Sequence, residues 1–376
     1  MIFGKDRLSK ETSEVVGKAL SPCGAVRGPS PMNEPTSRDS DPNAGEAYVS
    51  TGSLPSRDEV LALVETAHER FAREASGKIP DYIPALAEAN PAHFGICVAN
   101  TRGESFAVGD ADHAFSIQSV SKPFVFALVC DALGPDEAER MLGVDATGQP
   151  FNSVMAVELR ADHTTNPMVN SGAIATTSLV AGASAEDRWN RVRDGLSCFA
   201  GRRLELDERV YASEAATNER NAGIAHLLRG YGRVYCDPDE ATDVYTRQCS
   251  LLVAARDLAT MGATLAGGGV NPATGERVVS AGTCRRVLAV MATAGLYEHS
   301  GHWLFDVGLP GKSGVSGGIV TVAPGKGALA TFSPPLDEAG NSVRGLLATR
   351  FLSEQLGLNL FASAPVERGV ASGERS

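Results

Sequence analysis

The feature that most constrains the fold of this chain is a change in hydrophobic period along its length. Strand-like runs occur at 94–99 and 104–108, and again at 317–322 and 328–332, and each pair is joined by a turn that contains glycine. Between the two pairs, residues from about 125 to 300 carry mostly helical spacing. Strands near both ends with a helical middle predict one antiparallel sheet built from both parts of the chain, faced by helices, with a helical lobe inserted.

The same pattern divides the chain of 376 residues into regions. Its first part is rich in Ser, Pro, Gly, Asp and Asn without sustained periodicity, which predicts a disordered extension. A capping box at Ser56 to Glu59 is expected to open the first helix, and Ser342 to cap the last. The expected regions are an extension at 1–54, one catalytic domain at 55–363 with a sheet lobe (about 55–124 and 301–363) and a helical lobe (about 125–300), and a polar tail at 364–376.

Composition excludes several classes of function. The net charge of -11 argues against a nucleic-acid-binding surface, which needs a basic footprint. The seven cysteines form no C-x-x-C pair, which is typical of core thiols in a reducing compartment. The start has no apolar signal region, and no apolar stretch is long enough to cross a bilayer. We therefore predict a cytoplasmic protein without a nucleic-acid or membrane partner.

A Ser-x-x-Lys pair, Ser119 and Lys122, lies within residues 115–125. Because positions i and i+3 share one face of a helix, the Lys122 amine can reach the Ser119 hydroxyl. Burial lowers the pKa of a lysine, so that it can act as the base that a serine nucleophile needs. Pro123 fits the first turn of a helix, which would put Ser119 at the positive end of the helix dipole. Taken alone, the pair more often means a serine cap followed by a solvated lysine.

A second motif, KSGVSGG, begins at Lys312. A lysine, a hydroxyl and glycines on a strand beside the nucleophile helix form the third element of serine acyl-transferases of the Ser-x-x-Lys type. Glycines allow a substrate to approach the backbone closely, and amide groups there can help to form an oxyanion hole. Lys312 and Ser313 are therefore predicted to support the site. His299 and His302 lack the H-E-x-x-H spacing and have no accompanying ligand cluster, so we predict no metal.

With these motifs in place, the sequence resembles the serine-dependent glutaminase family. The resemblance implies hydrolysis of L-glutamine to L-glutamate and ammonia through a Ser–Lys acyl-enzyme, with no cofactor. It implies an α/β (α+β) fold like that of β-lactamases and DD-peptidases, and a homo-oligomer, because family members assemble as dimers or tetramers. The matching stretches follow the family's order and spacing over about residues 56–361: 77–87, 115–122, 166–174, 213–214, 220–221, 307–315, 333–337 and 340–342.

The resemblance also implies roles for individual residues. Ser119 matches the acylated nucleophile, Lys122 its base, and Tyr245 the tyrosine that assists proton transfer. The chemistry of the residues agrees, because Glu214 supplies an anion for the α-ammonium of glutamine and the asparagines supply donors for its α-carboxylate. The residues that match the substrate-binding set, besides Ser119 and Tyr245, are Tyr82, Gln118, Asn170, Glu214, Asn221, Tyr297 and Val315, the last with the Ser119 amide as the oxyanion hole.

Two other functions remain open at the level of sequence. A β-lactamase or penicillin-binding serine acyl-transferase would use the same Ser-x-x-Lys chemistry, but its substrates lie outside the cytoplasm. A non-catalytic glutamine sensor would keep the pocket and release no ammonia. Turnover of a chromogenic cephalosporin would identify the first, and a thermal shift with glutamine without hydrolysis would identify the second.

Overall fold

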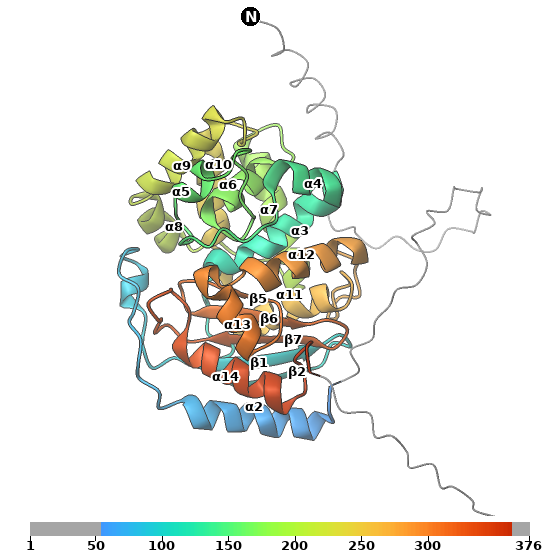
Figure 1. The fold of residues 1–376 in the computed structure, drawn as a ribbon. Coiled ribbons are helices and arrows are strands. Elements are labelled where there is room, and N and C mark those ends of the chain that lie inside the picture. The colour runs from blue at the N-terminus through green and yellow to red at the C-terminus, as the bar shows by residue number, and fades with distance from the viewer. Residues whose placement is uncertain (1–53, 363–376) are drawn as a thin grey trace, which may run out of the picture.

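The computed structural model describes residues 54–362, so the predicted N-terminal extension (apart from Leu54) and the polar tail lie outside the described residues. The centre of the fold is a five-stranded antiparallel sheet in the order β2-β1-β7-β6-β5, in the lower half of Figure 1. Strand β1 pairs with β7 along its whole length, so segments from both ends of the domain close one sheet, as predicted. The strands are β1 (Gly95–Asn100), β2 (Ser105–Gly109), β5 (Gly311–Ser313), β6 (Gly318–Ala323) and β7 (Gly327–Phe332).

Both predicted hairpins form, and local chemistry explains the first. The side-chain oxygen of Asn100 accepts hydrogen bonds from the backbone amides of Arg102 and Glu104, at 2.9 and 3.0 Å. Gly103 in the same turn has a φ of 92°, which glycine adopts without a steric penalty. Asn100 and Gly103 therefore fix the position of the turn between β1 and β2.

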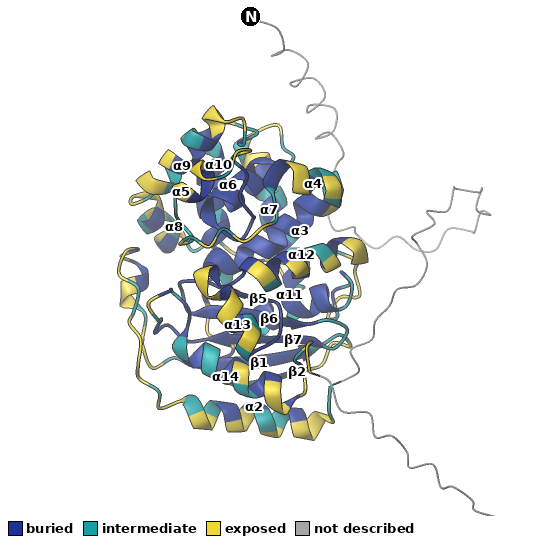
Figure 2. Ribbon diagram, viewed as in Figure 1, coloured by how far each residue is buried: buried dark blue, intermediate teal, exposed yellow. Residues whose placement is uncertain are grey.

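Helices cover both faces of the sheet. Helices α2 (Arg57–Phe71) and α14 (Val343–Gln355) pack on one face, and α11 (Ala255–Ala266) packs on the other against β1, β6 and β7. This position of α11 differs from the predicted helical lobe, which included it. A Cβ on Gly262 would lie 2.6 Å from that of Ala328, so the glycine lets α11 approach the strands closely. Nearly all residues of α11 are buried, as expected for a helix that lies between the sheet and the upper helices (Figure 2).

Most of the remaining helices form the upper layer in Figure 1, with α3 and α12 nearest the sheet, whereas α13 lies in the lower half beside the sheet. Figure 2 shows that their buried residues concentrate around α3 and α6, inside the outer helices. Among the described residues, no helix is long and apolar enough to span a membrane. The elements are α3 (Lys122–Leu133), α4 (Pro135–Leu142), α5 (Met155–Glu158), α6 (Asn170–Ser178), α7 (Ala185–Ala200), α8 (Glu208–Ala215), α9 (Glu219–Gly230), α10 (Pro238–Cys249) and α12 (Ala281–Ala294), with the short η1 (Leu86–Glu88), η3 (Tyr297–His299) and α13 (Ser300–Asp306).

Two local predictions were wrong and one was confirmed. Ser56 precedes α2 as predicted, but its side chain makes no capping hydrogen bond, and Asp58 and Glu59 instead place negative charge in the first turn. Ser342 does cap α14, because its hydroxyl accepts a hydrogen bond from the Gly345 amide. Within the region predicted to be mostly helical (about 125–300), residues 252–253 are not helical, and the helix there begins at Ala255. The two residues before Ala254 form strand β4 (Leu252–Val253), which pairs with β3 (Phe115–Ser116).

Candidate active site

Ser119 and Lys122 lie where strand β3 leads into helix α3. A 3-10 turn, η2 (Gln118–Ser121), carries Ser119, and α3 begins at Lys122 with Pro123 in its first turn. Ser119 therefore precedes the α-helix, at the positive end of its dipole. Gln118, directly before the serine, has a φ of 51°, a conformation that residues other than glycine rarely adopt and that is often found at functional sites.

The turn between β5 and β6 closes over η2 from the sheet side. A Cβ on Gly314 would lie 3.1 Å from the Ile117 carbonyl oxygen, so only a residue without a side chain fits comfortably there. The Ser316 hydroxyl donates a hydrogen bond of 2.6 Å to the Ser116 carbonyl oxygen. Val315 lies between these two residues and is buried. The backbone of the β5–β6 turn is therefore anchored beside the Ser119 turn.

Lys122 is almost completely buried, with 1% of its surface exposed. Its amine donates a hydrogen bond of 2.7 Å to the side-chain oxygen of Asn170, at the start of α6. The hydroxyl of Tyr245, on α10, donates to the same oxygen at 3.2 Å. Burial lowers the pKa of Lys122 to about 8, while nearby acidic groups, Glu214 among them, act in the opposite direction. Lys122 thus titrates close to neutral pH.

Glu214 and Gln118 form a second polar pair in the site. The Gln118 amide donates to a carboxylate oxygen of Glu214 at 3.2 Å. Burial raises the pKa of Glu214 to about 7, although this hydrogen bond and the charge of Lys122 oppose the shift. A cationic group placed beside this carboxylate would lower its pKa and stabilise its charge.

The sheet side contributes Lys312 and Tyr297. Lys312 is completely buried, and its amine donates to the carbonyl oxygen of Ser313 at 2.7 Å. It also lies 4.1 Å from the centre of the Tyr297 ring. Burial, with a smaller contribution from the charge of Lys122, lowers the pKa of Lys312 well below its usual value. Burial raises the pKa of Tyr297 to about 12, and its hydroxyl donates a hydrogen bond of 3.3 Å to the Ser313 carbonyl oxygen.

The other predicted substrate-binding residues fall into two groups. Asn221, on α9, accepts a hydrogen bond of 3.0 Å from the Asn170 amide, so these two asparagines touch. Tyr82 is 52% exposed and lines a cleft of about 720 Å³ whose lining also includes Val315 and Phe151. Phe151 packs against Tyr297, with 4.9 Å between the ring centres. Neither motif nor spacing pointed to Phe151, which joins the site only through tertiary packing.

His299 and His302 lie on η3 and α13 and pair with nearby aspartates, Asp337 at 3.9 Å and Asp306 at 3.4 Å. Within residues 54–362, no cluster of three or more His, Cys, Asp or Glu is arranged to hold a metal ion.

Comparison with known proteins assigns the family. The family model described as Glutaminase matches residues 77–361. Glutaminase 2 of Yersinia pestis is 60% identical over 318 residues, which cover 85% of this chain and 94% of that protein. A glutaminase of Brucella canis is 51% identical over 308 residues, covering 82% of this chain and 97% of the relative.

Solved structures agree. A probable glutaminase superposes with a TM-score of 0.81 at 44% identity, covering 82% of this chain and all of that one. A probable glutaminase from Bacillus subtilis, complexed with 6-diazo-5-oxo-L-norleucine, has a TM-score of 0.72 at 28% identity, with 84% and 99% coverage. These neighbours confirm the predicted β-lactamase-like fold. Given the match over most of its length, the chain belongs to the glutaminase family.

Proposed function

We propose that this amidohydrolase converts L-glutamine to L-glutamate and ammonia with Ser119 as the nucleophile and Lys122 as its base. The observation that carries the proposal is the environment of Lys122. The lysine is buried, its pKa is lowered to about 8, and its amine bonds to a neutral amide oxygen. A carboxylate partner would hold the amine in its charged form, whereas this arrangement leaves a useful fraction neutral near pH 8.

Acylation follows from this arrangement. The neutral Lys122 amine takes the proton of the Ser119 hydroxyl, and the serine oxygen attacks the side-chain amide carbon of glutamine. The tetrahedral oxyanion is stabilised by the backbone amides of Ser119 and Val315, and one such donor contributes about 2.7–4 kcal/mol. The carbon–nitrogen bond then breaks, protonated Lys122 donates its proton to the leaving group, and ammonia departs. A glutamyl ester on Ser119 remains.

Deacylation reverses the roles. Lys122, again neutral, takes a proton from a water molecule that attacks the ester carbon. The bond to the serine oxygen breaks, the proton returns to Ser119, and L-glutamate is released. Burial keeps the pKa of Tyr245 well above its usual value, so its hydroxyl stays protonated and can act as a donor in both steps.

Substrate binding uses the remaining polar groups. Glu214 pairs with the α-ammonium, and the amides of Asn170 and Asn221 donate to the α-carboxylate. The buried position of Glu214 supports this role, because an ionised carboxylate in an apolar setting is stabilised by an opposite charge. The side chains of Tyr82, Gln118 and Tyr297 line the rest of the substrate pocket.

The test of the proposal is ammonia release by Ser119→Ala. We expect this variant to lose essentially all activity on L-glutamine while keeping the wild-type melting temperature, because the change removes one buried oxygen atom. Assays with L-asparagine and a chromogenic cephalosporin accompany it. Wild-type-like ammonia release by the variant would remove Ser119 as the nucleophile, and rapid cephalosporin turnover without glutamine hydrolysis would favour a β-lactamase.

We also propose that the enzyme is a cytoplasmic homo-oligomer. Cys97, Cys130, Cys249 and Cys284 are buried free thiols, which fits a reducing compartment. The oligomer rests on the family resemblance, and Phe305, 85% exposed on α13, offers an apolar contact. Light scattering measures the assembly, and a monomeric mass at assay concentration would contradict it.

A further inference from the structure

A directed row of side-chain hydrogen bonds runs from the surface of the helical lobe to Lys122. Asn170 accepts from Lys122, and its amide nitrogen donates to Asn221 at 3.0 Å. Asn221 donates to the Asn218 side-chain oxygen at 2.7 Å, and Asn218 donates to the Thr246 hydroxyl at 2.7 Å. The row therefore contains three amides in series, each donating to the next and away from the lysine.

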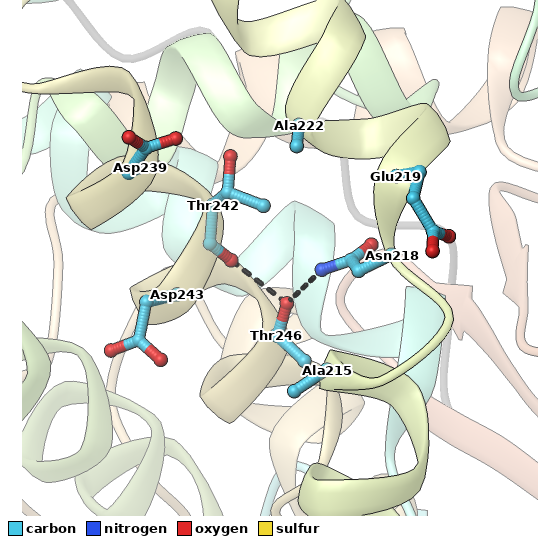
Figure 3. A pocket seen from close by; sticks show the side chains of 8 residues that line it. All are labelled: Ala215, Asn218, Glu219, Ala222, Asp239, Thr242, Asp243 and Thr246. Carbon is cyan, nitrogen blue, oxygen red and sulfur yellow. Dashed lines mark hydrogen bonds between the residues drawn. The ribbon is translucent and has the colours of Figure 1, made fainter.

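The outer end of the row lies in a cavity of about 340 Å³ between α8, α9 and α10. Figure 3 shows Asn218 and Thr246 in this cavity, with Thr242 on the other side of Thr246. The Thr246 hydroxyl donates to the Thr242 carbonyl oxygen at 2.8 Å. Thr246 is 1% exposed, whereas Asn218 is half-buried.

Counting donors fixes the direction of the row. A threonine hydroxyl has one hydrogen, and Thr246 uses it on Thr242, so toward Asn218 it can only accept. Asn218 must then present its NH2 group to Thr246 and its oxygen to Asn221. If any one of these side-chain amides were rotated by 180°, a donor would face a donor at one of its ends and an acceptor would face an acceptor at the other. The orientation is therefore shared by the whole row.

We infer that Asn218 and Thr246 are positioning residues for the glutaminase reaction, which set the orientation of Asn221 and Asn170 and so present an oxygen to Lys122. The inference rests on the proposed function of Ser119 and Lys122.

The orientation has two consequences for the chemistry. With its oxygen toward Lys122, Asn170 holds one N–H of the amine, so the lone pair of the neutral amine remains for the Ser119 proton. Asn170 and Asn221 each donate one amide hydrogen to the next residue of the row. The second amide hydrogen of each remains available to the substrate carboxylate. One hydroxyl on α10 thus orients both the base and the carboxylate donors.

The pH dependence should report this orientation. The Asn170 oxygen stabilises the charged form of Lys122, so losing it lowers the pKa of the lysine. The other groups that act on Lys122 would remain in place, namely Glu214 on α8, Tyr245 and Cys249 on α10, and Lys312 on β5. The acid limb of kcat/KM should therefore move to lower pH when the row is broken.

The experiment compares Thr246→Val with Thr246→Ser in the full chain. Valine keeps the shape of threonine but cannot accept from Asn218, whereas serine keeps the hydroxyl. We expect Thr246→Val to lower kcat/KM for L-glutamine about tenfold and to move the acid limb to lower pH, and Thr246→Ser to restore both. Glu219→Gln, next to Asn218 in the same cavity, should change neither, because Glu219 is no part of the row.

Asn218→Ala gives a second route to the same result, should the buried valine fail to fold. It should reproduce the loss and the pH shift, and the double variant with Thr246→Val should lose no more than either single variant, because both break one row. Wild-type kcat/KM and acid limb in a folded Asn218→Ala would overturn the inference. So would a lower melting temperature with no pH shift, or equal losses in Thr246→Ser. Activity in Ser119→Ala would instead reject the proposed nucleophile.

Discussion

Lys122 and Lys312 are two buried lysines on opposite sides of one site, and their hydrogen bonds differ. Lys122, at the start of α3, donates to the side-chain oxygen of Asn170, which belongs to another helix. Lys312, on β5, donates to the backbone carbonyl oxygen of Ser313, its neighbour in the same strand. Burial lowers the pKa of both lysines, to about 8 for Lys122 and well below the usual lysine value for Lys312.

Burial alone therefore does not make a lysine catalytic. Lys312 stacks against the Tyr297 ring and is tied to its own strand, so it supports a wall of the site. Lys122 lies one helical turn from Ser119 and bonds to an amide that other residues orient. We therefore expect removal of Lys122 to lower kcat far more than removal of Lys312.

The largest effect should come from Lys122→Met, which keeps the length of the side chain and removes the base. We expect kcat to fall by roughly 10²–10⁴-fold with a native fold, because general-base assistance contributes about that much. Steady-state ammonia release and circular dichroism measure the two quantities. A fall of less than tenfold would mean that another group activates Ser119.

Glu214→Gln should have the next largest effect. Losing the anion that pairs with the substrate ammonium should raise KM by about 10- to 100-fold, since hydrogen bonds to charged groups contribute about 1.5–3 kcal/mol. The negative charge of Glu214 raises the pKa of Lys122 in the free enzyme, so its removal should also shift the acid limb of kcat/KM to lower pH. An unchanged KM would place the ammonium elsewhere.

Lys312→Met should have the smallest effect on catalysis. Because Lys312 bonds to the backbone and not to the reacting groups, kcat/KM should fall by no more than about tenfold. The substitution should instead lower the melting temperature, because it leaves the buried Ser313 carbonyl oxygen without this hydrogen-bond donor. A fall in kcat as large as that of Lys122→Met would mean that Lys312 contributes as much to catalysis as Lys122.

The sequence predicted what depends on local chemistry. The hairpins, the Ser342 cap and the helix start after Ser119 follow from turn residues, caps and periodicity within short windows. Strand β4 was missed because its partner is β3, more than a hundred residues earlier in the chain. The packing of helix α11 against the sheet was not predicted, because an all-round apolar helix does not indicate what it packs against.

The candidate site divides in the same way. The Ser119–Lys122 spacing is local and could be read directly, and the resemblance supplied the substrate-binding set. The row that orients Asn170 joins α6, α9 and α10 through tertiary contacts. Asn218 and Thr246 lie 28 positions apart and match no motif, so only the folded arrangement shows their relation.

The pH profile of kcat/KM for L-glutamine tests most directly whether neutral Lys122 is the base. Activity should rise with pH and level off above about pH 8, because Lys122 must lose its proton in the free enzyme. The profile should steepen below about pH 7, where Glu214 becomes protonated. Activity that stays constant as the pH falls from about 8 to below about 7, or that rises only near the usual lysine value of 10.5, would contradict this role of Lys122.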